Sequence, residues 1–312
     1  MSRDGRASGE PPFVSVIVPV YDDAARLILC LEALHQQTYA PDRFEVVVID
    51  NGSSEDIVGA CRGFAQVRCV DEPRPGSYVA RNTGVAASSG EVLAFTDADC
   101  LPQRDWLEQG VHRLERSPEG TIVGGSVPVF AKDPARPTSA ELYESAFAFP
   151  QRRRIEEEHW GVTANLFVPS IVMAAVGPFD ERARSGGDAE WCRRAHAAGY
   201  RIVYEEAARV DHPARSSVAE LLRKARRVGG GARVARREVP TRDLLRYLAR
   251  SALSCAKKSL RVLCGAPRDA DGSRRFTLIQ RLRIVAVLHL VTVRRLTEVV
   301  ARRLTDRPAS RR

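Results

Sequence analysis

The sequence contains no long apolar segment. Its most apolar stretch after the middle of the chain, Leu282–Val293, covers only twelve residues and is interrupted by Arg283 and His289. A bilayer crossing needs about 20 apolar residues. Residues 1–12 are polar and charged and have no apolar core of signal-peptide length. We therefore expect a flexible leader over 1–12 and a cytoplasmic protein.

The cysteines also lack any informative spacing. The seven cysteines of the 312-residue chain are scattered, odd in number and include no Cys-x-x-Cys pair. This pattern indicates neither a disulfide framework nor a zinc site, and it suits a reducing compartment. No internal repeat is evident, so the chain is expected to form one catalytic-sized domain with an appendage.

Acidic residues become rare toward the C-terminus. Residues 213–312 hold 26 lysines and arginines against 7 aspartates and glutamates, whereas residues 1–212 hold 22 against 32. Such asymmetry predicts a region that seeks an anionic surface, either nucleic acid or anionic lipid. Its aromatic residues, Tyr247 and Phe276, are too few for base stacking. Anionic lipid is therefore the favoured partner, and nucleic acid is not expected.

What the first half does contain is a regular alternation of strand and helix patterns. Apolar, β-branched runs alternate with helical spacing, which predicts a mostly parallel sheet flanked by helices on both faces. The expected strands are Val14–Val20, Phe44–Ile49, Val67–Val70 and Val92–Phe95, and the expected helices are Ala24–Gln37 and Tyr78–Ala87.

Further along, the patterns are less regular. We expect a helix over Trp106–Leu114, a weakened strand over Thr121–Phe130 and a last short strand over Arg201–Tyr204. These elements predict a Rossmann-like α/β domain over 13–212, followed by a basic helical region over 213–312.

Two interpretations of that helical region stay open. Leu282–Val293 is an amphipathic helix lying on an anionic membrane, or a helix packed on the core or on a second subunit as in a homodimer. The run Gly229-Gly230-Gly231 does not follow a strand, so we expect a hinge there rather than a phosphate loop.

A pair of carboxylates follows the fourth expected strand. Asp97 and Asp99 come directly after Val92–Phe95, and alternate residues of an extended chain point the same way. Ligand sites of open α/β sheets lie beyond the carboxyl ends of the strands. Oxygen ligands there favour magnesium or manganese, which usually bridge to substrate phosphates.

Five segments, in this order and spacing, resemble motifs of the inverting family 2 glycosyltransferases, whose fold is called GT-A. The resemblance covers Val14–His212 and implies transfer of a sugar from a nucleoside-diphosphate sugar, in the first place a UDP-sugar. The Gln-x-x-Arg-Trp signature of processive members is absent, which favours one sugar per encounter. The segments are Val16–Tyr21, Val47–Ser53, Ala80–Gly84, Phe95–Asp99 and Gly177–Glu181.

The resemblance implies a set of donor-site roles. Pro19 and Tyr21 line the pocket of the base, Asp50 hydrogen-bonds the base, and Arg81 reaches the nucleotide. Manganese or magnesium is held together with the diphosphate, for which the implied residues are Asp97 (ribose and metal), Asp99 (metal) and His212 (third metal ligand). A rim aromatic at position 21 and a structural histidine at position 212 are the alternatives.

On the acceptor side the resemblance implies Asp188 as the general base that takes a proton from the attacking hydroxyl. The residue before this base is usually Glu in the family and is Gly187 here, which leaves Glu190 as a second candidate. Asn165 is expected to hydrogen-bond sugar hydroxyls. Trp160 and Trp191 stack on a sugar ring or lie buried in the core.

Two other functions compete with sugar transfer. A nucleotidyltransferase would need a glycine-rich, basic triphosphate loop after the first strand, but Tyr21-Asp22-Asp23 is acidic. A catalytically inactive protein that binds anionic membrane or nucleic acid through its basic region is the second alternative. For a transferase the acceptor hydroxyl stays open among a lipid-linked sugar, a cell-envelope glycan precursor and a natural product.

Overall fold

The computed structural model describes residues 10–232, 239–265 and 276–305, so most of the expected leader lies outside the described residues. The described chain divides into two compact units. The first comprises the residues up to Val127, Gln151–Glu181 and Gly187–Asp211, and the second comprises Pro128–Pro150, Arg182–Gly186 and the chain from His212 onward. The domain limits expected from the sequence, 13–212 and 213–312, differ from these units and stay a prediction.

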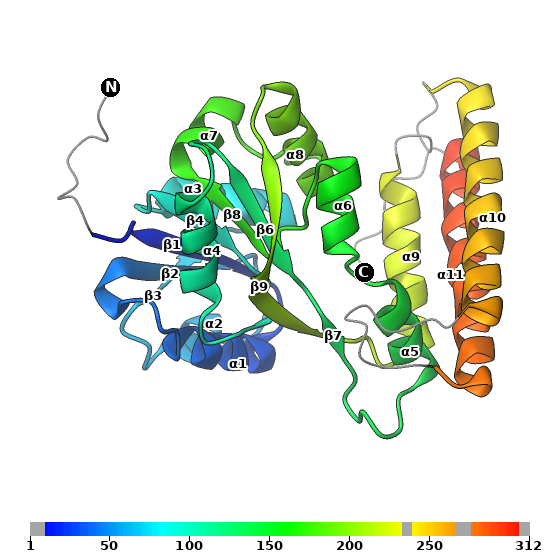
Figure 1. Ribbon diagram of the computed structural model, residues 1–312, viewed down its shortest axis with the longest axis horizontal. Helices are drawn as coiled ribbons and strands as arrows, with labels where there is room; N and C mark the ends of the chain where they lie inside the picture. Colours follow the sequence, from blue (N-terminus) through cyan, green and yellow to red (C-terminus); the bar gives the residue numbers. More distant parts are fainter. Residues whose placement is uncertain (1–9, 233–238, 266–275, 306–312) are drawn as a thin grey trace. The chain divides into compact units, whose positions relative to one another are not determined.

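The first unit is built on a mixed sheet with the strand order β3-β2-β1-β4-β8-β6-β9-β5 (Figure 1). The strands β3, β2, β1 and β4 are parallel, whereas β8 runs antiparallel between β4 and β6. The predicted α/β class is confirmed. The strands are β1 (Val14–Val20), β2 (Phe44–Asp50), β3 (Val67–Asp71), β4 (Val92–Phe95), β5 (Leu101–Pro102), β6 (Ile122–Ser126), β8 (Leu166–Pro169) and β9 (Ile202–Pro213).

The register of the parallel strands positions the site. Val20 of β1 pairs with Asp50 of β2, and Ile17 of β1 pairs with Phe95 of β4. The side chains of these strands are largely buried because helices cover the sheet. The residues that follow β1, β2 and β4 therefore emerge at one edge of the sheet.

Helices pack along this sheet, and one of them approaches it closely. In α3 a Cβ atom at Gly84 would lie 2.6 Å from Cγ2 of Ile17, so only glycine lets the helix rest on β1 and β2 at this distance. The helices of the first unit are α1 (Ala24–His35), α2 (Ile57–Cys61), α3 (Ser77–Ala87), α4 (Trp106–Glu115), α6 (Gln151–Glu158), α7 (Ser170–Val176) and α8 (Gly187–Ala197), with a 3-10 turn at Pro41–Arg43.

Two strand predictions need correction. The strand expected over Thr121–Phe130 is two strands, β6 and β7 (Val129–Phe130), because the pairing of β6 with β9 shifts after Gly125 and Pro128 has no N–H to donate. The last strand is longer than expected, since β9 continues to Pro213. In the second unit β7 pairs with its end, Val129 opposite His212.

The second unit consists mainly of helices: α5 (Ser139–Phe147), α9 (Val218–Gly231), α10 (Thr241–Cys264) and α11 (Leu278–Thr305). The helix α11 contacts the other three, and small apolar clusters join them, such as Leu221 of α9 with Val287 of α11. In the described part of the chain, no helix combines the length and hydropathy that a bilayer crossing requires.

The expected hinge at Gly229-Gly230-Gly231 is instead the end of α9. A Cβ atom at Gly229 would lie 2.5 Å from the carbonyl oxygen of Arg295 in α11. Real Cβ atoms essentially never approach a backbone oxygen so closely. The glycine therefore serves close packing of α9 on α11, and the hinge prediction is wrong.

Candidate active site

The residues expected on the donor side lie where β1 and β2 end. Tyr21 follows β1 directly and is 65% exposed, so its ring is accessible as a wall for a base. Pro19 lies two residues earlier, inside β1. Asp50 is the last residue of β2, and its Oδ1 accepts a hydrogen bond of 2.9 Å from the backbone N–H of Ser53. This hydrogen bond within the turn after β2 holds the carboxylate at the edge of the sheet.

Asn51 ties the end of β2 to the entrance of α3. Its Nδ2 donates to the carbonyl oxygens of Glu72 (2.9 Å) and Arg74 (2.7 Å), and its Oδ1 accepts from the N–H of Gly76 (2.8 Å). Gly76 has φ +146°, a conformation that L side chains rarely adopt. These bonds set the position of the first turn of α3.

Arg81 of α3 is buried against Asp97, the first residue of the carboxylate pair. Only 5% of this residue is exposed; its Nη2 donates to Oδ1 of Asp97, and its Nη1 donates to the carbonyl of Ser77 at 3.0 Å. Its buried Nε has no hydrogen-bond partner among the described residues. Asp97 and Asp99 keep 33% and 23% of their side chains exposed. A guanidinium therefore lies beside a carboxylate pair that solvent reaches.

The donor set of this pair suits a hard divalent cation. Asp97 and Asp99 offer carboxylate oxygens after β4, and Mg²⁺ and Mn²⁺ prefer oxygen ligands. Arg26 lies 3.8 Å from Asp99, so each carboxylate has a guanidinium neighbour. These cationic groups balance the two negative charges and are of the sign that a diphosphate requires.

Asp188 lies in the first turn of α8. Its Oδ1 accepts hydrogen bonds from the hydroxyl of Tyr78 (3.3 Å) and from the N–H of Ala189 (2.9 Å). Burial raises the pKa of Asp188, and the hydrogen bonds together with the charges of Arg81 and Arg154 only partly oppose it. A carboxyl group with a raised pKa is a stronger base than an ordinary one, as general-base catalysis requires.

Tyr78 fills the space beside Asp188 where a side chain at Gly187 would lie. A Cβ atom at Gly187 would lie 2.7 Å from Cε2 of the Tyr78 ring. Burial raises the pKa of Tyr78 to about 12, with the charge of Asp188 adding to the effect, so its hydroxyl stays protonated and donates. The tyrosine thus occupies the place that the sequence pattern left without its usual glutamate.

Asn82, the neighbour of Arg81, holds the segment that precedes α8. Its Nδ2 donates to the carbonyl of Phe179 (3.0 Å), and its Oδ1 accepts from the N–H of Phe179 (2.9 Å). The Phe179 ring then packs on three aromatic side chains with ring centroids 5.6 to 5.8 Å away, those of Tyr78, Phe95 and Trp191. Helix α3 therefore positions both halves of the site.

Asn165 is fully buried and its side chain is engaged by the protein. Its Oδ1 accepts from Nε1 of Trp106 (2.9 Å), and its Nδ2 donates to the carbonyl oxygens of Ser126 and Ala208 (2.8 Å each). Both amide hydrogens are used. These contacts give the expected sugar contact no support and make Asn165 a link between strands.

The remaining acceptor-side residues are also tied to protein groups. Trp191 is fully buried, and its Nε1 donates to the carbonyl of Gly177 at 2.7 Å. The indole of Trp160 lies under the guanidinium of Arg154 at 4.6 Å. Glu190 forms an ion pair of 2.7 Å with Arg194 one turn later. Asp188, the other candidate base, instead accepts hydrogen bonds from Tyr78 and Ala189.

His212 lies near the end of β9 and is 4% exposed. Its Nδ1 is 2.7 Å from the carbonyl oxygen of Pro213, and its ring packs on Phe149 with the centroids 4.8 Å apart. The preceding residue, Asp211, pairs with Leu101 two positions after Asp99. These facts place His212 in the strand, and its role as a metal ligand stays a prediction.

Some of these contacts could not be predicted from local patterns. Tyr78 and Asp188 are 110 residues apart in sequence, and Asn82 and Phe179 are 97 apart. From the sequence, Tyr78 is identifiable only as the start of a helix. One signal was present: the missing side chain at Gly187 beside an expected base calls for a compensating group.

Comparison with known proteins supports a single family. A family model described as glycosyl transferase family 2 matches residues 15–170, half of the chain. Glycosyltransferase AglE of Haloferax volcanii is 41% identical over 228 residues, covering 70% of this chain and 73% of that protein. The pre-mycofactocin glycosyltransferase of Mycobacterium tuberculosis is 30% identical over 235 residues. These cover 70% of this chain but 46% of the mycobacterial protein, so the chain spans about half its length.

Solved structures share the fold at low sequence identity. The mannosyltransferase PcManGT from Pyrobaculum calidifontis, in complex with GDP-Man and Mn²⁺, matches with a TM-score of 0.54 and 20% identity. The match covers 94% of this chain and 74% of that one. TarS 1–349 of S. aureus, in complex with UDP-GlcNAc, matches with a TM-score of 0.53 and 17% identity over 69% of this chain and 66% of that one.

The segment that the family model matches holds β2, β4, nearly all of β1 and the Asp97–Asp99 pair, which form the edge of the sheet where the donor site is expected. Family membership favours sugar transfer over both competing functions, nucleotidyl transfer and inactive binding. The mixed sheet with its flanking helices agrees with the GT-A neighbours. The chain therefore belongs to glycosyl transferase family 2 and is a glycosyltransferase of the GT-A fold.

Proposed function

We propose that this glycosyltransferase moves one sugar from a nucleoside-diphosphate sugar to an acceptor hydroxyl with inversion at the anomeric carbon. The proposal rests on one turn of α3 that contacts both Asp97, on the expected diphosphate side, and Asp188, on the expected acceptor side. Arg81 of α3 bonds Asp97, and Tyr78, three residues earlier, bonds Asp188. The guanidinium of Arg81 lies 5.8 Å from the centre of the Tyr78 ring.

Asp188 is the proposed general base. It accepts the proton of the acceptor hydroxyl while the hydroxyl oxygen bonds to the anomeric carbon and the bond between that carbon and the diphosphate breaks. A single displacement of this kind inverts the anomeric configuration. The carboxylate is deprotonated before the step and protonated after it, and its raised pKa favours this transfer.

The diphosphate end is proposed at Asp97 and Asp99, where Mn²⁺ or Mg²⁺ would be held, with His212 as the third ligand. When bound, such an ion neutralises charge that develops on the leaving diphosphate. Arg81 is buried beside this pair and contributes a fixed positive charge in the same place. Similar structures with Mn²⁺ and nucleotide sugars support this assignment.

The base and ribose of the donor are proposed to lie between Pro19, Tyr21 and Asp50. The exposed ring of Tyr21 offers a stacking surface, and the carboxylate of Asp50 accepts hydrogen bonds. We propose a uridine nucleotide, which agrees with the UDP-GlcNAc held by one structural neighbour, although another holds GDP-Man. For the acceptor we propose a lipid-linked or cell-envelope glycan precursor.

A screen of nucleotide sugars tests the proposal. Release of the nucleoside diphosphate is measured for each donor with manganese, with magnesium and with EDTA. One donor class should be turned over in a metal-dependent way, and Asp188→Asn should lower transfer by at least about 100-fold, since general-base catalysis contributes that much. Glu190→Gln is the matched control and should retain transfer. Turnover of no donor, or full activity of Asp188→Asn, would contradict the proposal.

A further inference from the structure

One face of α11 exposes apolar side chains along its whole length. Leu278, Leu282, Leu290, Val293 and Leu304 are each more than half exposed. The remaining exposed positions before residue 305 are also uncharged, namely Ile279, Ala286, His289, Thr297 and Ala301. From residue 278 to 304 this stripe extends about 39 Å at 1.5 Å per residue.

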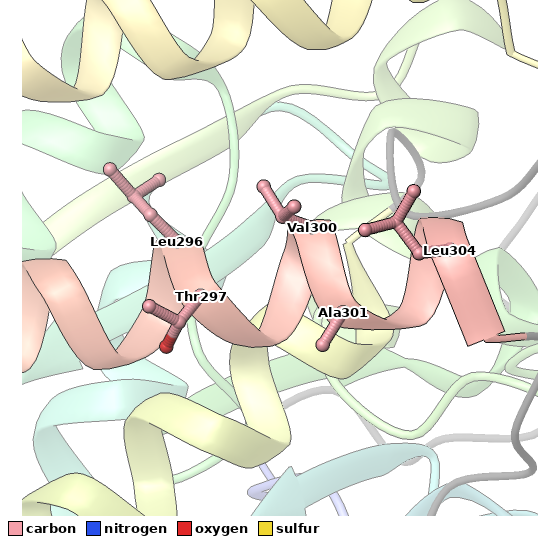
Figure 2. A pocket seen from close by; sticks show the side chains of 5 residues that line it. All are labelled: Leu296, Thr297, Val300, Ala301 and Leu304. Carbon is pink, nitrogen blue, oxygen red and sulfur yellow. The ribbon is translucent and has the colours of Figure 1, made fainter.

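The same stripe ends in a shallow apolar depression on the last turns of α11. Figure 2 shows the side chains that line it, contributed by successive turns of the helix: Leu296, Thr297, Val300, Ala301 and Leu304. All of them are apolar apart from the small hydroxyl of Thr297. An apolar strip of this length on a monomer marks an interaction surface rather than ordinary exposure.

The helix α10 adds a second stripe with a basic border. Leu245, Leu253 and Leu260 are 60%, 56% and 63% exposed and, at 3.6 residues per turn, lie within one sector of the helix. Four exposed basic residues form a row along one side of this stripe: Arg246, Arg250, Lys257 and Arg261. The opposite side of α10 is buried, for example at Leu244 and Val262.

The two stripes face the same side of the helix pair. Ser259 Oγ of α10 lies 3.1 Å from Nε2 of His289 in α11. At 100° per residue, Ser259 is at the margin of the α10 stripe, and His289 is within the α11 stripe. The exposed leucines of both helices therefore form one surface, which we name the apolar face: Leu245, Leu253 and Leu260 with Leu278, Ile279, Leu282, Leu290, Val293 and Leu304.

We propose that the apolar face lies in the headgroup region of an anionic lipid bilayer. An apolar helix surface bordered by arginine and lysine binds there because leucines enter the acyl boundary while the cations contact lipid phosphates. Charge selects lipid over a second copy of the chain, since residues 213–312 hold 26 basic against 7 acidic residues and two such regions repel. This inference does not depend on the proposed chemistry of sugar transfer.

The test is co-sedimentation of the full chain with vesicles. Equal parts of phosphatidylglycerol and phosphatidylcholine are compared with phosphatidylcholine alone. The chain should bind the anionic vesicles preferentially, and the double variant Leu282→Glu/Leu290→Glu should weaken binding by at least about tenfold, since two half-exposed leucines are replaced by charges. Arg250→Glu/Lys257→Glu should remove the preference for anionic vesicles.

The control is Ile171→Glu, which places the same charge at a residue of α7 that is 64% exposed in the first unit. It should bind vesicles like the natural chain. Circular dichroism verifies that each variant is folded, and donor hydrolysis in solution should stay unchanged in all of them. Equal binding to both vesicle types, unchanged binding by the leucine variant, or a dimer that this variant disperses would each overturn the proposal.

Discussion

Gly187 makes room for Tyr78: a Cβ atom at position 187 would lie 2.7 Å from Cε2 of the tyrosine ring. The hydroxyl of the same tyrosine donates to Asp188 at 3.3 Å. The space that a side chain at Gly187 would fill, next to the proposed base, is thus occupied by the Tyr78 ring from α3. We infer that Tyr78 positions Asp188 and helps to set its pKa.

Tyr78→Phe tests this role through pH. The hydroxyl stabilises the deprotonated form of Asp188 and so lowers the pKa that burial raises. Its removal raises that pKa further. Because the base acts when deprotonated, the acid limb of the pH profile of kcat/KM should move to higher pH. An unshifted acid limb would show that the hydroxyl does not act on the base.

Gly187→Ala should disturb the same contact by displacing the ring. We expect a loss of about 1–3 kcal/mol in the free energy of unfolding, the usual cost of overpacking. The double variant Gly187→Ala/Tyr78→Ala removes the clash. Its loss should therefore be smaller than the sum of the two single losses, as measured by urea denaturation. Additive losses would argue against direct contact between the two positions.

Asn165→Ala distinguishes a link between strands from a sugar contact. The substitution leaves the indole N–H of Trp106 and the carbonyls of Ser126 and Ala208 without their buried partner. Each unsatisfied buried group costs about 1–3 kcal/mol, so the variant should be severely destabilised. A stable variant with a raised KM for the donor or acceptor would instead restore the expectation from the sequence.

The acid side of the stability curve offers a separate test. Burial raises the pKa of Glu45, but hydrogen bonds from Ser15, Ser89 and Arg68 outweigh it and hold this pKa at about 2. A depressed carboxyl pKa contributes stability that is present above the ordinary pKa and is lost as the pH falls toward 2.

Glu45→Gln should therefore lower the free energy of unfolding by about 1.5–3 kcal/mol at neutral pH, the range for hydrogen bonds to a charged group. The difference between variant and natural chain should shrink as the pH falls from the ordinary glutamate range toward 2. The exposed Glu55→Gln is the comparison, since its carboxylate accepts a hydrogen bond from the backbone N–H of Ala24 at the surface. A difference that is constant with pH would contradict this account.

The sheet, and the grouping of polar residues at the edge where we propose that the donor binds, could be predicted because their signals are local. The β-branched runs of β1, β2 and β4 each end at polar residues, and parallel pairing aligns Val20 with Asp50. The separation of β6 from β7 was harder to predict from the sequence, since the register shift after Gly125 depends on pairing with β9. Strand length there is decided by the partner rather than by the residues of the strand itself.

The acceptor side was harder because its side chains serve both packing and chemistry. Asn165 and Trp191 are residue types that sugar sites use, yet their partners are Trp106 and the backbone of Gly177. Such partners come from segments distant in sequence. Tyr78 went unassigned for the same reason, since only the fold brings it to Asp188.

The proposed diphosphate end at Asp97 and Asp99 is the central claim, and titration calorimetry with nucleoside diphosphates measures it most directly. UDP should bind the natural chain in the presence of manganese, and EDTA or Asp99→Asn should weaken binding by at least about tenfold, which is about 1.4 kcal/mol. The control Asp105→Asn changes an aspartate that precedes α4 and should bind UDP normally. Binding of UDP that neither EDTA nor Asp99→Asn affects would contradict the claim.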